Sequence, residues 1–566
     1  MTYVLGLSGG YFHDSSACLV RDGALLAYSE EERWSRRKQN RDSRRCSCSV
    51  LSCLEQAKIN PADIHKIAIS WNPAFSNQKD STRGGSLRQE ILSGLPFLPD
   101  LPVEFTVVDH HLSHAASSFY CSGFKDAVVL VIDGSGDGLS TTLWKANEST
   151  GMQSIRAFDF RHSLGWFYET ATEYVGFQDW SSAGKFMGLA SYGNPVDEFE
   201  DIISLSSEGY ELKYDIPATG DDYASLEYYW RLKKHLFTYF EKRGVPRAHQ
   251  KQIFLQHKGL WENQTEFNQA HKDFAASVQN TLQRCIATLV EFAVKSTGLK
   301  RICLAGGVAL NCAANGFLCE RFPDLEIFIC PFANDSGGSV GAAMEVSRQL
   351  GRFAPTKMQD AGIGPEFSDD HIAIALNRAG LSHWHEPDFP KYIAQCIAAG
   401  KIVGWFQGRA EAGPRALGHR SILADPRKVG IRDRVNRDVK TRELWRPLCP
   451  SIAEEQITTF SDSRCIDDFM LIAQKASPAA RELIPAVVHI DGTMRCQRVR
   501  KSTNPTYYSL LNELESTIGV PVVLNTSFNS ANEPIVGTPL DAMRTFISTD
   551  LDVLSIGSFI VSKLPR

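Results

Sequence analysis

The 566-residue chain has no apolar run near the ~20 residues needed to span a bilayer. Its start, MTYVLGLSGG, has neither a basic segment nor a small-residue cleavage site, so we expect no secretory leader. No sign of charge is in excess, because 60 Lys+Arg stand against 65 Asp+Glu, a net charge of −5. That balance argues against non-specific nucleic-acid binding. We therefore expect a cytoplasmic protein with no membrane or nucleic-acid partner.

Internal repeats with a period of roughly 20–50 residues and low-complexity tracts are also absent. Hydrophobic residues make up 43% and charged residues 22%, values typical of soluble globular proteins. At ~150 residues per domain the length predicts two to four domains. The 14 cysteines are scattered, so free thiols are expected. Cys46, Cys48 and Cys53 cluster, but without an obvious fourth ligand a structural zinc is disfavoured.

Three strand-like segments each run into a polar or glycine-rich turn. Residues 3–28 read as a β-meander whose first turn follows Gly9-Gly10, and the runs 127–132 and 301–305 end at Asp133-Gly134-Ser135-Gly136 and Gly306-Gly307. Glycine permits close approach of the backbone to phosphates, and exposed N–H groups bind anions. The pattern therefore predicts an α/β nucleotide-binding fold built from two similar halves.

Helical periodicity extends over 274–294, and the mixed charges and aromatics of 220–270 predict helical insertions. Residues 351–368 are rich in Gly, Pro and polar side chains, and a helix start follows at Asp369. We place a domain boundary there, giving domains 1–355 and 368–566, of which the second is long enough for its own core.

His110 and His114 are four residues apart on a predicted helix with Asp109 at its N-cap, so both imidazoles face one side. Asp133 and Asp335 each follow an apolar run, where a charge needs a partner. Two His and two Asp would suit Fe²⁺, Mn²⁺ or Zn²⁺. The alternative is a pair of hydrogen-bonded surface histidines.

Two single residues have both a functional and a structural interpretation. His13, in the first turn, could orient or deprotonate a reacting group, or simply cap the turn. Lys185, in GKFMGLA, could contact phosphate or be solvated, and its segment is too short for a Walker A motif.

Residues 408–421 place Arg409, Arg415 and Arg420 among three glycines. Guanidinium groups bind phosphate bidentately. Further cationic residues follow, with the segment LNTSFN at 524–529 after them: Lys440, Arg446, Arg495, Arg498, Arg500 and Lys501. Because these arginines are set in Gly/Pro turns, a small-polyanion pocket is favoured over an RNA-binding surface or a charged face for solubility.

From residue 1 to about residue 564 the chain resembles the NodU/CmcH-type O-carbamoyltransferases of natural-product and Nod-factor biosynthesis. The motifs that carry the resemblance are FHDSSA at 12–17, EEER at 30–33, DHHLSHAAS at 109–117, GKFMGLA at 184–190, AGGVALN at 305–311, GPRALGHRS at 413–421, WRPLCPS at 445–451 and LNTSFN at 524–529. The resemblance implies a TsaD-like first domain of the actin-like ATPase superfamily and a YrdC-like second domain. One departure is His419, where the family often has Gln.

The resemblance implies two reactions. The second domain would make carbamoyl adenylate and pyrophosphate from carbamoyl phosphate and ATP with Mg²⁺. The first domain would transfer the carbamoyl group to a hydroxyl of a secondary metabolite or oligosaccharide and release AMP. The implied carbamoyl phosphate and ATP positions are Arg415, Lys440, Arg446, Arg495 and Asn525. The implied metal ligands, usually for Fe²⁺, are His110, His114, Asp133 and Asp335. The implied adenylate positions are Lys185, Gly306, Gly307 and Asn311, and the implied catalytic residues are His13, Arg415 and Lys440.

Two other functions stay open at this point. The glycine-rich turns also fit a sugar kinase of the actin-like superfamily, and the basic second domain fits a tRNA-modification partner. The acceptor, the oligomeric state (a homodimer is one option) and the acceptor-side base are not indicated. Asp221 and Asp222 are candidate bases on a variable loop.

Overall fold

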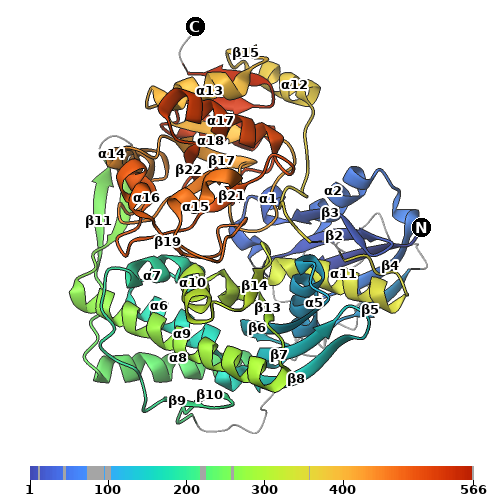
Figure 1. The fold of residues 1–566 in the computed structure, drawn as a ribbon, viewed down its shortest axis with the longest axis vertical. Coiled ribbons are helices and arrows are strands. Elements are labelled where there is room, and N and C mark those ends of the chain that lie inside the picture. Colours follow the sequence, from blue (N-terminus) through green and yellow to red (C-terminus); the bar gives the residue numbers. More distant parts are fainter. Residues whose placement is uncertain are drawn as a thin grey trace. The chain divides into compact units, whose positions relative to one another are not determined.

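The computed structural model describes residues 1–9, 13–41, 46–72, 95, 103–216, 225–255, 260–355 and 357–563. The fold is α/β and forms two compact units, one of residues 1–124 and 328–566 and one of residues 125–327 (Figure 1). Among the described residues no helix is both long and apolar enough to cross a membrane. Asp221 and Asp222 lie outside the described residues.

The first sheet contains the predicted meander. Its strands are β1 (Tyr3–Ser8), β2 (Ser16–Arg21), β3 (Ala24–Glu30), β4 (Ile64–Ile69) and β5 (Glu104–Val107), in the order β3-β2-β1-β4-β5. β1, β2 and β3 are antiparallel, and β4 and β5 run parallel to β1. Helices α2 (Ser47–Ala57), α5 (His110–Ser122) and α11 (Gly338–Gln349) belong to the same unit. α11 packs directly on β1. The two backbones approach so closely that a Cβ at Gly6 would lie 2.0 Å from the Ser339 carbonyl oxygen.

The second unit repeats this strand order. Its sheet is β14-β13-β6-β7-β8, made of β6 (Asp126–Gly136), β7 (Leu139–Asn147), β8 (Gly151–Asp159), β13 (Arg301–Ala305) and β14 (Glu326–Ile329). Again three antiparallel strands form a meander, and the next strand runs parallel to the first of them. The two similar halves predicted from the glycine-rich turns are therefore confirmed. β6 continues past its predicted end at Ile132, because a register shift against β7 carries the strand on to Gly136.

The second unit also contains helices. They are α6 (Leu164–Val175), α7 (Ala183–Ala190), α8 (Ser225–Lys242), α9 (Gln269–Thr297) and α10 (Cys312–Arg321). Two hairpins complete it, β9 (Ile203–Ser206) with β10 (Gly209–Leu212) and β11 (Gln250–Leu255) with β12 (Leu260–Thr265). The prediction of helical insertions over 220–270 is thus right for α8 and wrong for the strands β11 and β12. The predicted helix at 274–294 lies inside the longer α9.

An eight-stranded sheet organises the C-terminal region, in the order β15-β24-β23-β16-β17-β22-β18-β21. Its strands are β15 (His383–His385), β16 (Val403–Phe406), β17 (Arg420–Ala424), β18 (Cys449–Ala453), β21 (Gln497–Val499), β22 (Val522–Ser527), β23 (Val553–Ile556) and β24 (Phe559–Ser562). The longer helices here are α12 (Asp369–Ala379), α13 (Phe389–Ala398), α17 (Pro505–Ile518) and α18 (Pro539–Ser548). Shorter elements are α14 (Val429–Arg434), α15 (Ile457–Phe460), α16 (Pro478–Leu483) and the pair β19 (Gln474–Lys475) and β20 (Thr493–Met494).

Apolar side chains of this sheet are fully buried and give the region its own core, among them Ile422, Ile452 and Leu524. α12 begins at the predicted Asp369, where the Ser368 side chain accepts a hydrogen bond from the backbone N–H of His371. The predicted boundary at 355–368 lies between α11 and α12, and among the described strands no sheet draws on both sides of it. A functional division at that boundary stays a prediction.

Candidate functional site

Helix α5 presents two histidines on one face. Asp109 occupies the predicted N-cap, but it acts through its carbonyl, which accepts a hydrogen bond from Ser113 N at 2.8 Å, and its side chain makes no capping bond. Nε2 of His110 and Nε2 of His114 are 3.1 Å apart. The two side chains are 4% and 0% exposed, so the alternative of a surface histidine pair is wrong.

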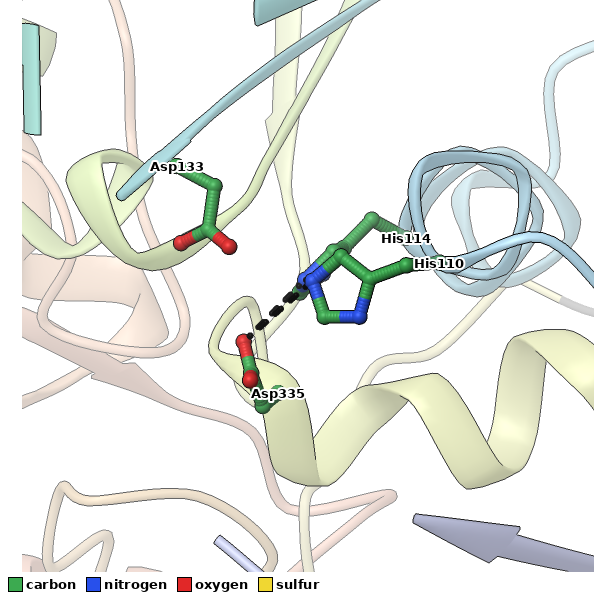
Figure 2. A group of neighbouring side chains, drawn as sticks. All are labelled: His110, His114, Asp133 and Asp335. Carbon is green, nitrogen blue, oxygen red and sulfur yellow. Dashed lines mark hydrogen bonds and ion pairs between the residues drawn. The ribbon is translucent and has the colours of Figure 1, made fainter. Parts of the chain in front are cut away.

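Asp335 faces the two imidazoles from the short helix η6 (Asp335–Gly337), as Figure 2 shows. Its Oδ1 is 3.3 Å from His114 Nε2 and 3.7 Å from His110 Nε2. Ser8 Oγ donates a hydrogen bond to the Asp335 carbonyl, which ties this turn to the end of β1. One ligand atom from each of the three residues lies within 4.8 Å of the others. Two imidazole nitrogens and a carboxylate oxygen fit a divalent transition metal.

His13 lies beside the same carboxylate. Its Nδ1 is 3.2 Å from Asp14 Oδ2 and 3.8 Å from Asp335 Oδ2, and the His13 side chain is 31% exposed. Asp14 has a φ of 50° and its backbone N–H donates to the Gln39 carbonyl at 2.6 Å. Burial raises the pKa of the Asp14 carboxyl, against the opposing effect of His13. The sequence analysis gave Asp14 no role, although it directly follows His13 in the FHDSSA turn.

Asp133 lies in β6 of the second unit and contacts the glycine-rich turn that follows β13. Its Oδ1 accepts a hydrogen bond from Gly307 N at 3.0 Å. Gly306 has a φ of 84°, and a Cβ there would lie 2.2 Å from the Ile132 carbonyl oxygen, so only glycine fits. Asp133 is thus tied to this turn by a hydrogen bond. A role for Asp133 as a metal ligand stays a prediction.

The other predicted adenylate-side residues also lie in the second unit. Asn311 caps α10, where its Oδ1 accepts from Ala314 N at 3.0 Å, and its amide pairs with that of Gln279 at 2.9 and 3.1 Å. Asn311 is 8% exposed, so much of its hydrogen-bonding capacity serves the fold. Lys185 is half-buried on α7.

Lys440 ends a π-helical turn, η7 (Val435–Val439), and is buried. Its ammonium donates to the Ser527 carbonyl at 2.8 Å, to Ser527 Oγ at 3.2 Å and to the Asn529 carbonyl at 2.9 Å, and it also contacts Asn529 Oδ1. Burial lowers the pKa of Lys440 well below its usual range, and Arg442 and Arg446 lower it further. Lys440 therefore holds the LNTSFN segment and joins a cluster of like charge.

We call Lys440, Arg442, Arg446 and Arg495 the cation cluster. Burial and then Arg446 lower the pKa of Arg442, and burial lowers the pKa of Arg446 against its partner Glu443, with Arg495 lowering it further. Glu443 lies 3.6 Å from Arg446 Nη1. Arg442 Nε donates to Asn436 at 2.8 Å, while its Nη2 is buried with no hydrogen-bond partner. Repulsion between these cations raises the free energy of the folded protein, and a bound anion would lower it.

Asn525 and Arg415 belong to neighbouring segments. Asn525 is fully buried in β22, and its Nδ2 donates to the Ala416 carbonyl at 3.1 Å and to Ser451 Oγ at 3.0 Å. Arg415 is half-buried and directly precedes Ala416. The sequence analysis missed Arg442, although it named Lys440 and Arg446; the signal was a further cationic residue two positions after Lys440.

Several other arginines serve the fold instead of a phosphate pocket. Arg420 is fully buried, lies 3.6 Å over the Phe406 ring and donates to four backbone carbonyls, and Arg409 donates to the Gly364 and Ile363 carbonyls. Arg498 and Arg500 both pair with Asp468. The idea that all three arginines of 408–421 bind phosphate is therefore wrong for Arg409 and Arg420, because carbonyl oxygens already take their donors.

His419, the departure from the family pattern, pairs with Asp360. The two side chains are 3.2 Å apart, and the carboxylate raises the pKa of the buried imidazole against the effect of burial. His419 thus anchors the segment 351–368 to the C-terminal region.

Comparison with known proteins shows to which family the chain belongs. The family model described as Carbamoyltransferase N-terminus matches residues 97–344, and that described as Carbamoyltransferase C-terminus matches residues 394–563. Nodulation protein NolNO of Sinorhizobium fredii is 36% identical over 99% of this chain and 82% of its own length. An uncharacterized protein of Synechocystis sp. is 33% identical over 100% of this chain and 97% of its own. The chain belongs to the carbamoyltransferase family.

This carbamoyltransferase also resembles nodulation protein NolO of Bradyrhizobium diazoefficiens, with 36% identity over 81% of this chain and 79% of the relative. Among solved structures it is similar to full-length HypF in the phosphate- and nucleotide-bound form, with 16% identity, 62% of this chain and 56% of that chain covered, and a TM-score of 0.33. The family makes the chain an enzyme that transfers a carbamoyl group.

Proposed function

We propose that this carbamoyltransferase activates the carbamoyl group with ATP in its C-terminal region and then transfers it to a hydroxyl near His13 and the histidine pair. The observation that carries the proposal is the cation cluster, in which burial and the neighbouring cationic side chains lower the pKa of Lys440, Arg442 and Arg446. Carbamoyl phosphate and ATP are both polyanions, and bringing them together requires this concentration of positive charge.

The first reaction balances with one water. Water cleaves carbamoyl phosphate to carbamate and phosphate, and a carbamate oxygen then attacks the α-phosphorus of ATP. The bond between the α- and β-phosphates breaks, carbamoyl adenylate forms and pyrophosphate leaves. Arg415, Arg446, Arg495 and Asn525 would hold the phosphates, and Lys440 would fix the segment that lines them. Mg²⁺ would accompany ATP.

The second reaction joins the carbamoyl carbon to the acceptor oxygen. The hydroxyl oxygen attacks the carbamoyl carbon, the bond from that carbon to the adenylate oxygen breaks, and AMP leaves with that oxygen. The hydroxyl proton must pass to a base, and His13, whose Nδ1 lies 3.8 Å from Asp335 Oδ2, would either take it or orient the carbonyl. A divalent metal, Fe²⁺ by the family resemblance, would be held by His110, His114 and Asp335, with Asp133 as the fourth proposed ligand; when bound it would stabilise negative charge on the adenylate phosphate.

The adenylate would lie against the glycine-rich turn of the second unit. Gly306 and Gly307 are proposed to contact it, although the Gly307 N–H already donates to Asp133, and Lys185 and Asn311 are proposed on the same side of the reaction. For the acceptor we propose a hydroxyl of a secondary metabolite or oligosaccharide. The resemblance to enzymes of Nod-factor biosynthesis implies an oligosaccharide among these, and two relatives are named nodulation proteins.

The proposed first reaction is tested by incubating the purified protein with carbamoyl phosphate, ATP and Mg²⁺. We expect pyrophosphate and phosphate in equal amounts, and AMP once an acceptor is added. The sugar-kinase alternative would instead give ADP from ATP and a sugar without carbamoyl phosphate. Absence of pyrophosphate with Fe²⁺, Mn²⁺ and Zn²⁺ each supplied in turn would refute ATP-dependent activation.

A further inference from the structure

Glu30 lies at the end of β3, and its carboxylate is buried, with 6% of the residue exposed. Its Oε1 is 3.2 Å from each of three donors, which are the Tyr28 hydroxyl, Ser336 Oγ and Gly413 N. Its Oε2 forms an ion pair with Arg33 Nη2 at 2.6 Å. Because Ser336 and Gly413 are 306 and 383 residues away in the chain, one carboxylate joins three distant segments.

Ser336 carries one of these contacts to the turn that holds Asp335, the carboxylate that faces the histidine pair in Figure 2. The Ser336 hydroxyl lies between Glu30 Oε1 and Asn334 Oδ1, the latter at 3.0 Å. The Ser336 carbonyl accepts a hydrogen bond from Ser16 Oγ at 2.6 Å. The backbone that carries the Asp335 carboxylate is therefore held in part by Glu30.

Gly413 carries another contact to the turn that holds Arg415, two residues further on. Gly413 has a φ of 88°, and a Cβ there would lie 2.1 Å from the Pro331 carbonyl oxygen, so the position requires glycine. Its N–H donates to Glu30, and its carbonyl accepts from Arg33 Nη2 at 2.7 Å. The ion pair of Glu30 and Arg33 thus holds both polar backbone groups of Gly413, and with them the start of the GPRALGHRS turn.

A buried ion pair by itself contributes little net stability. Taking each charge out of water costs several kcal/mol, and apolar side chains of similar volume often stabilise a core equally well. A carboxylate supplies direction that an apolar side chain lacks, because its oxygens accept hydrogen bonds from donors at defined positions. Catalytic groups must be held within about 0.5 Å of their productive geometry. Glu30 supplies such directed contacts to two turns at once, one with Asp335 and one with Arg415.

We propose that Glu30 is a positioning residue for both half-reactions, whose carboxylate fixes the Asp335 turn and the Arg415 turn relative to each other. The inference rests on the proposed function, in which Asp335 holds the metal for carbamoyl transfer and Arg415 holds phosphate during activation. Glu30 would act through these turns and not on a reactant. Because Ser336 leads to the metal site and Gly413 to the activation site, the two effects can be separated by experiment.

The main variant is Glu30→Gln, which keeps the size of the side chain and removes its charge. Glu345→Gln is the matched control, because Glu345 is also buried, also pairs with an arginine three residues further on and also accepts from a tyrosine hydroxyl. The partners of Glu345, which are Tyr120, Arg348 and Gln349, lie outside both turns. Urea unfolding measures how far each substitution lowers the free energy of unfolding, so that both assays use folded protein.

Pyrophosphate release from carbamoyl phosphate and ATP gives kcat and KM, and titration of metal-free protein with Mn²⁺ gives a dissociation constant. We expect Glu30→Gln to lower kcat for pyrophosphate release about 10- to 100-fold, the effect of displacing a catalytic group by about 1 Å. The Mn²⁺ dissociation constant should rise about 10-fold, the effect of losing a contact behind a metal ligand. Glu345→Gln should leave kcat and the Mn²⁺ dissociation constant at their wild-type values.

Two milder variants separate the contacts and keep the inference testable if Glu30→Gln does not fold. Ser336→Ala removes the hydroxyl next to Asp335, so it should raise the Mn²⁺ dissociation constant and leave pyrophosphate release unchanged. Arg33→Lys keeps the charge but lacks the guanidinium fork that reaches both Glu30 and the Gly413 carbonyl. It should slow pyrophosphate release by a larger factor than it raises the Mn²⁺ dissociation constant.

Wild-type values of both quantities in folded Glu30→Gln would overturn the inference, as would a change in only one of them. Equal changes in Glu30→Gln and Glu345→Gln, or unchanged Mn²⁺ binding in Ser336→Ala, would also overturn it, and all four outcomes leave the proposed function standing. A wild type that releases no pyrophosphate would overturn ATP-dependent activation and, with it, the joint role of Glu30.

Discussion

Replacing Lys440 by methionine keeps the length of the side chain and removes its charge. Two of the ammonium's hydrogen bonds go to backbone carbonyls, of Ser527 at 2.8 Å and Asn529 at 2.9 Å. Bonds from a charged donor contribute about 1.5–3 kcal/mol each, so about 3–6 kcal/mol is lost. Burying the ammonium costs several kcal/mol of desolvation free energy, and the uncharged methionine does not have this cost. The free energy of unfolding should therefore change little, by about 0–3 kcal/mol.

Catalysis should respond much more strongly than stability. The variant loses one cation of the cluster and the support of the loop 527–535, and loss of one electrostatic contact in a preorganised site costs about 10²–10³-fold in rate. Pyrophosphate release from carbamoyl phosphate and ATP is the assay, and urea unfolding measures stability in parallel. Lys428→Met, which removes an exposed lysine before α14, is the matched control and should match the wild type. Pyrophosphate release within a factor of about three of the wild type in Lys440→Met would refute the electrostatic role argued here.

Three further outcomes are expected. His114→Ala should lower both the amount of bound transition metal and the rate of carbamoyl transfer, while pyrophosphate release persists. The control His385→Ala, which removes an exposed histidine, should leave the metal content and the transfer rate unchanged. Full transfer by a metal-free His114→Ala protein would contradict the metal site. Gly306→Ala should lower the free energy of unfolding by about 2–4 kcal/mol, because a Cβ would clash with the Ile132 carbonyl. Gly298 has a similar φ of 71° but open space around it, so Gly298→Ala should lower the free energy of unfolding by only about 1 kcal/mol in thermal unfolding. Equal losses in the two variants would rule out the clash. The pKa of Lys440 is lower in the folded than in the unfolded chain, so between those two values the unfolded chain binds more protons and the free energy of unfolding rises with pH. Urea unfolding without phosphate ligands should show this rise up to about pH 10. If the rise persists in Lys440→Met, another group causes it.

Local sequence patterns predicted those parts of the protein whose cause is local. The meander at 3–28, the strand 301–305 and the start of α12 at Asp369 follow from apolar runs, turn residues and a capping side chain within a few positions of one another. The i, i+4 spacing on α5 likewise predicted that His110 and His114 share a face. The helical insertions predicted over 220–270 are wrong where β11 and β12 pair with each other.

Contacts between residues far apart in the chain could not be predicted in this way. Nothing in the residues around Arg420 distinguishes it from Arg415, yet Arg420 is fully buried among carbonyls, because the strand that carries it lies in the middle of the eight-stranded sheet. Asp335 meets the histidines of α5 from more than 200 residues away. Sequence by itself determined the local elements and the family; only tertiary packing decided which charged side chains are neutralised by the fold and which, such as Arg442, are brought close to other cations at a cost that a bound anion would offset.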